Sequence, residues 1–96
     1  MKLVRDKIPD IIRNNGETPR THIANDEEYW RMLVEKLNEE INEFSEAENA
    51  EELADVLEVI DAIIAHRFDK TAVKEIQDEK REKRGGFTKR IIWEGN

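Results

Sequence analysis

The segment from Ala50 to Phe68 constrains the fold most, because nearly every uncharged position in it is apolar. At roughly 100° per residue, its apolar side chains cover well over half of a helix circumference. The positions outside that stripe are mainly Asp55, Glu58, Asp61 and His66. One neighbouring helix cannot cover such a surface, and a chain of 96 residues with 38% hydrophobic side chains offers few other partners. We therefore expect a second copy to complete a helical bundle as a homodimer, with a tetramer of two dimers left open.

The residues before this segment predict a helix that pairs with it. Asn25 is a good N-cap residue, and Glu28 follows it at capping-box spacing. Apolar residues then recur at helical spacing for about four turns: Tyr29, Trp30, Leu33, Val34, Leu37, Ile41 and Phe44. Asn49 can cap the next helix, so the short Ser45–Asn49 connection predicts an antiparallel helical hairpin.

The two ends of the chain carry weaker signals. A third helix is expected from near Asp69 to Arg84, where Gly85-Gly86 ends it, and a short helix is expected at Pro9 to Ile12. The segments Thr21–Ala24 and Lys89–Trp93 predict short strands. The sequence therefore predicts one all-α domain over residues 1–96, with short strands toward its ends.

Composition excludes several classes of function. The net charge of −7 argues against a generic nucleic-acid binder, and the absence of cysteine excludes disulfides, thiol nucleophiles and cysteine metal sites. No apolar run is long enough to span a membrane, and the first residues lack the apolar stretch of a signal peptide. We therefore expect a cytoplasmic protein with no membrane and no nucleic-acid partner.

Two pairs of acidic residues stand at the spacing of a metal site. Glu40 with Glu43, and Glu52 with Asp55, are each three apart, so each pair can project from one side of a helix. Glu40 also lies at the edge of the predicted apolar stripe, where a carboxylate needs a counter-charge. If the pairs face each other across the hairpin, their oxygens suit Mg²⁺ or Mn²⁺. Such pairs also arise by chance in an acidic chain, so an ordinary charged surface is the alternative.

The order of these motifs resembles a known family. Glu39, Glu40 and Glu43 form Glu-Glu-x-x-Glu, and Glu52 and Asp55 follow as Glu-x-x-Asp. This order resembles the signature of the MazG-like, all-α nucleoside triphosphate pyrophosphohydrolases. Further segments are similar to that family or to its phosphoribosyl-ATP pyrophosphohydrolase-like branch: Asp78-x-Lys80-x-x-x-Arg84, the opening Lys2–Pro9 and the closing Lys83–Phe87. Asp78 stands where the family usually has Asn, and the gap between Glu43 and Glu52 is shorter than is common.

The resemblance implies a metal-dependent enzyme. In that family Mg²⁺ holds the triphosphate while water attacks the α-phosphorus, which releases a nucleoside monophosphate and pyrophosphate. The implied metal ligands are Glu40, Glu43, Glu52 and Asp55. Glu39 is then a base that acts beside the metal ligands, or a solvated residue.

Basic residues flank this acidic segment. By the same resemblance, Lys80 and Arg84 would contact phosphate; the alternative is a surface ion-pair face. Lys2, Arg5 and Lys7 are further phosphate candidates or exposed charges, and Trp30 either stacks on a base or packs in the core.

Two other functions stay open at this stage. One is hydrolysis of phosphoribosyl-ATP in histidine biosynthesis, and the other is a non-catalytic helical dimer that binds nucleotides or a protein partner. No pattern in the sequence indicates a base or sugar preference.

Overall fold

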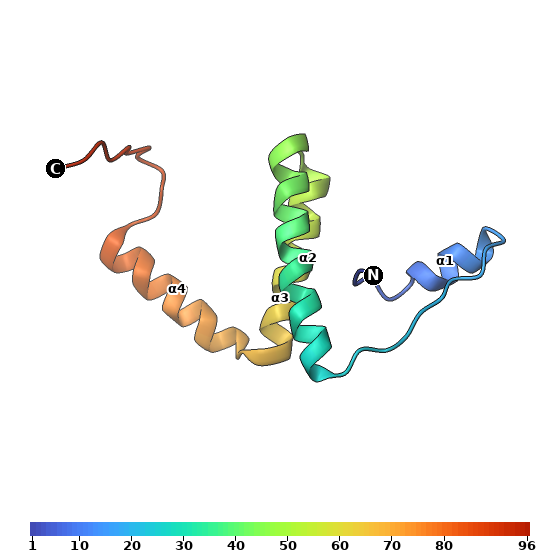
Figure 1. The fold of residues 1–96 in the computed structure, drawn as a ribbon. Helices are drawn as coiled ribbons and strands as arrows, with labels where there is room; N and C mark the ends of the chain where they lie inside the picture. The colour runs from blue at the N-terminus through green and yellow to red at the C-terminus, as the bar shows by residue number, and fades with distance from the viewer.

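A computed structural model describes residues 1–96 as four α-helices without strands (Figure 1). They are α1 (Ile8–Asn14), α2 (Asp26–Ala47), α3 (Ala50–Arg67) and α4 (Lys70–Arg84). The all-α prediction is confirmed. The predicted strands at Thr21–Ala24 and Lys89–Trp93 are wrong, since neither segment has regular structure. A short extended segment becomes a strand only where a second one pairs with it, and the chain offers no such partner.

Helices α2 and α3 form the predicted antiparallel hairpin, and Figure 1 shows them side by side. The Asn25 side chain accepts a hydrogen bond from the Glu28 amide at 2.9 Å, and Asn49 does the same for Glu52 at 2.9 Å. Glu48 ends α2 in the left-handed conformation (φ 50°), which reverses the chain within two residues. Local caps thus fix both helix starts and the tight connection between them.

The other two helices extend away from the hairpin. Asp69 is the N-cap of helix α4, and its side chain accepts a hydrogen bond from the Ala72 amide at 3.3 Å. Among the helices, α4 contacts only α3. Helix α1 contacts no other helix, and the two helices project to opposite sides of the hairpin (Figure 1).

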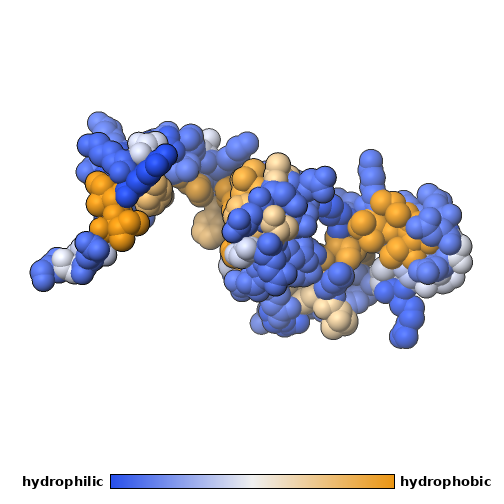
Figure 2. All heavy atoms as spheres, turned by 90° about the horizontal axis from the view of Figure 1, so that it is seen from above, coloured by the Kyte–Doolittle hydropathy of each residue, from blue (hydrophilic) through white to orange (hydrophobic).

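One chain encloses almost no core. Leu33 and Val59 are the only buried apolar residues, and Glu40 is the only buried charged residue. The radius of gyration is 17.7 Å, compared with about 12–13 Å for a compact chain of this length. Apolar side chains stay exposed on α3, on α1 and on the segment after α4, and Figure 2 shows apolar patches toward both ends of the molecule. None of the helices is long and apolar enough to cross a membrane.

Candidate metal centre

Glu40 is the most buried charged residue of the chain and lies where α2 faces α3. The residue is 6% exposed, as its predicted place at the edge of the apolar stripe implies. Oε1 lies 3.2 Å from the Lys36 Nζ, one helical turn earlier. Oε2 is buried and has no hydrogen-bond partner. A buried oxygen without a partner is costly, so this atom favours an additional positive ligand.

Helix α3 brings two more carboxylates to Glu40. One oxygen each of Glu40, Glu52 and Asp55 lies within 4.8 Å of the others. Glu52 also has a buried Oε2 without a partner. Three predicted ligands from two helices thus meet at one point, which we call the carboxylate cluster.

Glu43, the fourth predicted ligand, lies beside the cluster. Its carboxylate groups with those of Glu39 and Glu40, again within 4.8 Å. The hydrogen bond that Glu43 would donate to Glu40 when protonated and the negative charge of Glu40 raise the pKa of Glu43, with smaller contributions from desolvation and the charges of Glu52 and Glu39. Glu43 therefore holds a proton more tightly than a free glutamate does, as expected where negative charges crowd together.

Lys36 supplies one of the two positive charges that the structure pairs with the cluster. Its Nζ lies 3.2 Å from Glu40 and 3.5 Å from Glu39. Desolvation alone would lower the pKa of Lys36, but the hydrogen bond to Glu40 and the charges of both carboxylates outweigh it and raise the pKa. Lys36 was not among the residues predicted from the sequence, although its spacing of four from Glu40 is typical of an ion pair along a helix.

Arg5 is the second positive charge. Its Nη2 donates to the Asp55 Oδ1 at 2.7 Å, so the N-terminal segment reaches the cluster directly. Lys2 lines a hollow with Lys36 and Glu39, between the N-terminal segment and α2. Lys7 is exposed at the start of α1. Two of the three predicted N-terminal phosphate contacts thus lie near the carboxylates, and sequence spacing gave no hint of the ion pair with Asp55.

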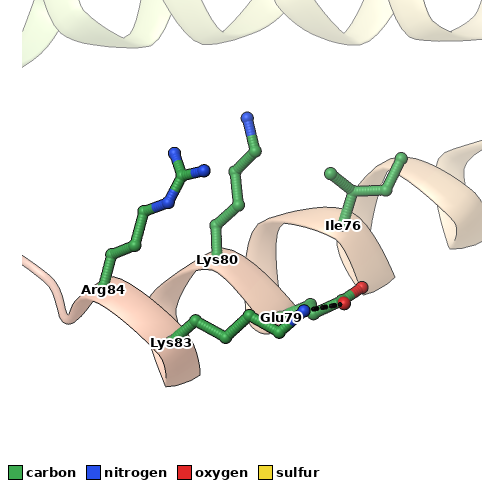
Figure 3. Close-up of a pocket in the computed structure, with 5 residues that line it drawn as sticks. All are labelled: Ile76, Glu79, Lys80, Lys83 and Arg84. Atoms are coloured by element: carbon green, nitrogen blue, oxygen red, sulfur yellow. Dashed lines mark hydrogen bonds and ion pairs between the residues drawn. The ribbon is translucent and has the colours of Figure 1, made fainter.

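The basic residues of α4 are placed differently. Figure 3 shows Lys80 and Arg84 extending from the same side of α4, apart from the ion pair of Lys83 with Glu79 at 2.7 Å. Asp78 pairs with Lys74 at 3.1 Å. Because α4 contacts only α3 among the helices and makes no contact with α2, one chain does not bring Lys80 and Arg84 to the carboxylate cluster.

Trp30 lies against the C-terminal end of α3. The Arg67 guanidinium lies 4.2 Å from the centre of its ring, and the rings of His66 and Phe68 lie at 6.3 and 6.4 Å. These contacts account for the position of Trp30 through packing and a cation–π interaction. Stacking on a nucleobase stays a prediction.

Comparison with known proteins adds one relative. A segment of 47 residues is 47% identical to an uncharacterized protein of Mycolicibacterium smegmatis, and it covers 49% of this chain and 48% of that protein. The chain thus matches about half the length of its curated relative, which has no described activity. No family model and no solved structure matches the chain.

Proposed function

We propose that the protein is a metal-dependent nucleoside triphosphate pyrophosphohydrolase, in line with the family resemblance of its acidic motifs. One observation carries the proposal. Glu40 and Glu52 each keep a buried oxygen without a partner, and oxygens of Glu40, Glu52 and Asp55 lie within 4.8 Å of one another. Oxygen ligands at this spacing suit Mg²⁺, and Mn²⁺ is a close substitute. As part of the proposal, the protein acts in the cytoplasm as a homodimer and removes unwanted nucleotides.

Under this proposal, Glu40, Glu52 and Asp55 hold the cation, and Glu43 beside them is the fourth ligand. A bound Mg²⁺ would supply charge neutralisation and polarisation of the phosphoryl group at this site. Glu39, at the edge of the cluster, accepts the proton of the attacking water. The phosphorus–oxygen bond to the β-phosphate then breaks, and pyrophosphate leaves with the nucleoside monophosphate as the other product.

The basic residues have separate roles in this scheme. Arg5, which pairs with Asp55, and Lys2, which shares a hollow with Lys36 and Glu39, contact the phosphates as charge moves toward the leaving group. Lys80 and Arg84 would contribute in the same way only where α4 is brought to a cluster, which a single chain does not do.

A second candidate is a non-catalytic helical dimer that binds nucleotides or a protein. The exposed apolar side chains of α3, with Leu53 45% and Leu57 55% exposed, favour it. In that case the carboxylates would form an ordinary charged surface. The two unpartnered buried oxygens argue for the enzyme, because a merely solvated surface does not bury carboxylates.

A nucleotide panel with product identification tests the proposal. Purified protein with Mg²⁺ is incubated with ordinary and damaged nucleoside triphosphates and with phosphoribosyl-ATP, and pyrophosphate and orthophosphate are measured separately. We expect pyrophosphate from at least one substrate. Turnover of phosphoribosyl-ATP alone would assign the biosynthetic reaction, and no turnover of any substrate would refute the enzyme.

Variants connect the activity to the cluster. Asp55→Asn removes a proposed ligand and should lower turnover at least about 100-fold, since even groups that only support a ligand matter 10–100-fold. Glu58→Gln, the same kind of change one turn further along α3 on an exposed residue, should keep full turnover. Equal loss in both variants would assign the effect to the fold.

A further inference from the structure

The last part of the chain extends away from the hairpin as an arm. We define the C-terminal arm as α4 together with residues 85–96. Its apolar side chains are unusually exposed: Ile76 55%, Phe87 98%, Ile91 80%, Ile92 81% and Trp93 78%. Figure 2 shows part of this apolar surface as a patch at the end of the molecule where the chain terminates. Exposed apolar residues gathered in one segment indicate a binding surface.

The hairpin offers a matching surface. Leu53 and Leu57, one turn apart on α3, are 45% and 55% exposed, and Val34 and Ile41 of α2 are 39% and 43% exposed. The single chain covers only about half of each of these residues. Hairpin and arm thus each lack an apolar partner.

The total exposed area indicates how much a partner must cover. The chain exposes 8824 Å², whereas a compact protein of 11.3 kDa exposes about 5,700 Å². The excess is about 3,000 Å² per chain. For two chains the excess is about 6,000 Å², and obligate homodimers bury about 2,000–5,000 Å² or more in total, so a second copy can cover most of it.

Charge decides which surfaces meet. The hairpin (residues 26–67) carries 14 acidic and 3 basic residues, whereas the arm (residues 70–96) carries 8 basic and 5 acidic residues. Two hairpins face to face would bring like charges together, and a hairpin against an arm brings opposite charges together. The favoured contact is therefore between hairpin and arm.

The connection between α3 and α4 decides which hairpin the arm meets. Only Phe68 and Asp69 separate the two helices, and the Asp69 side chain caps α4 in the direction that leads away from the hairpin (Figure 1). Helix α4 then runs for 15 residues, about 22 Å, without touching α2. Folding back onto its own hairpin would require this capped connection to be rebuilt. We propose that the C-terminal arm packs onto the α2–α3 hairpin of a second copy of the chain, so that two copies exchange arms.

Molecular mass tests the role of the arm. The full chain should sediment at twice 11.3 kDa at micromolar concentration, and Ile92→Asp should return it to 11.3 kDa. Ile23→Asp is the matched control, because Ile23 is 97% exposed but lies outside both arm and hairpin. The control should remain dimeric. A dimer that survives Ile92→Asp, Trp93→Asp and their combination would overturn the proposal, provided that circular dichroism shows unchanged helix content.

Cross-linking tests the exchange. Because the chain has no natural cysteine, only introduced thiols can react with the cross-linker. One chain carries Leu57→Cys and another carries Ile92→Cys; the two are mixed, and a thiol cross-linker of short span is added. A covalent pair between the two different chains is expected, and pairing Leu57→Cys with Asp10→Cys should give far less. If a chain with both Leu57→Cys and Ile92→Cys links only within itself, the arm folds back and the exchange is wrong.

A membrane surface is the competing occupant, since the arm combines basic and aromatic residues. Flotation with vesicles that contain anionic lipid distinguishes it. Binding that Ile92→Asp abolishes, in a protein that remains at 11.3 kDa without vesicles, would overturn the proposal in favour of a lipid partner.

Discussion

Replacing Glu40 by Gln tests whether a bound cation or contacts within the protein stabilise the carboxylate cluster. In the cation-free protein, Glu40 repels Glu52 and Asp55 and attracts Lys36. At an effective dielectric constant of about 20, two ionised carboxylates 4.8 Å apart repel by about 3.5 kcal/mol, and the Lys36 contact at 3.2 Å contributes about 5 kcal/mol of attraction. Arg5 already offsets part of the charge of Asp55. Glu40→Gln removes two repulsions of this size, about 7 kcal/mol, against one attraction of about 5 kcal/mol, and the charges of Glu39 and Glu43 add to the repulsion. The free energy of unfolding of the cation-free protein should therefore not fall.

With Mg²⁺ the same substitution should have a large effect. A ligand present at 100 times its dissociation constant stabilises the native state by about 2.7 kcal/mol. For a domain of this size each kcal/mol moves Tm by about 4–8 °C, so the unsubstituted protein should gain about 10–20 °C. Glu40→Gln replaces the central anionic ligand by a neutral amide and should lose most of that gain.

Thermal unfolding followed by circular dichroism measures both effects, in a chelator and in excess Mg²⁺, with NaCl at equal ionic strength as the screening control. Glu58→Gln carries the same charge change on an exposed residue outside the cluster and should keep the full Mg²⁺ gain. If Glu40→Gln keeps the gain as well, Mg²⁺ binds elsewhere and the reasoning about the cluster fails.

Three further outcomes follow from single residues. The raised pKa of Glu43 means that the folded state holds the Glu43 proton more tightly than the unfolded state does. Protonated Glu43 therefore stabilises the cation-free protein fully below about pH 4.5, and this stabilisation is lost as pH rises through the raised pKa. Glu43→Gln should therefore flatten the fall of Tm with pH. Arg5→Gln should cost less than about 1 kcal/mol, because the ion pair with Asp55 is partly exposed, yet calorimetry should show tighter Mg²⁺ binding once Arg5 no longer competes for Asp55. Asn49→Ala removes the cap of α3 and should cost about 1 kcal/mol, measured as a drop in Tm.

The helices could be predicted because their ends are fixed by local hydrogen bonds. Asn25, Asn49 and Asp69 each cap the helix that follows, and each is recognisable from its own side chain and its neighbours. The segments Thr21–Ala24 and Lys89–Trp93 could not be predicted in this way. A strand depends on a distant partner, and residue preference alone does not reveal that none exists.

The candidate site was also predictable only where it depends on local spacing along the chain. The spacing of Glu40, Glu52 and Asp55, together with a short hairpin connection, was enough to expect carboxylates from two helices at one point. The ion pair of Arg5 with Asp55 joins residues 50 positions apart, and nothing local encodes it. The distance of Lys80 from the cluster likewise depends on the direction in which α4 leaves the hairpin.

The acidic hairpin and the proposed dimer are energetically connected. Each chain carries a net charge of −7, so bringing two chains together concentrates negative charge even though hairpin and arm attract each other locally. A divalent cation in each cluster removes part of that repulsion, and by reciprocity dimer formation must strengthen cation binding by the same factor. The dissociation constant of the dimer, measured by sedimentation, should therefore fall when Mg²⁺ replaces NaCl at equal ionic strength, and Glu40→Gln should abolish the difference. A dimer equally stable in both salts would mean that the cluster and the interface act independently.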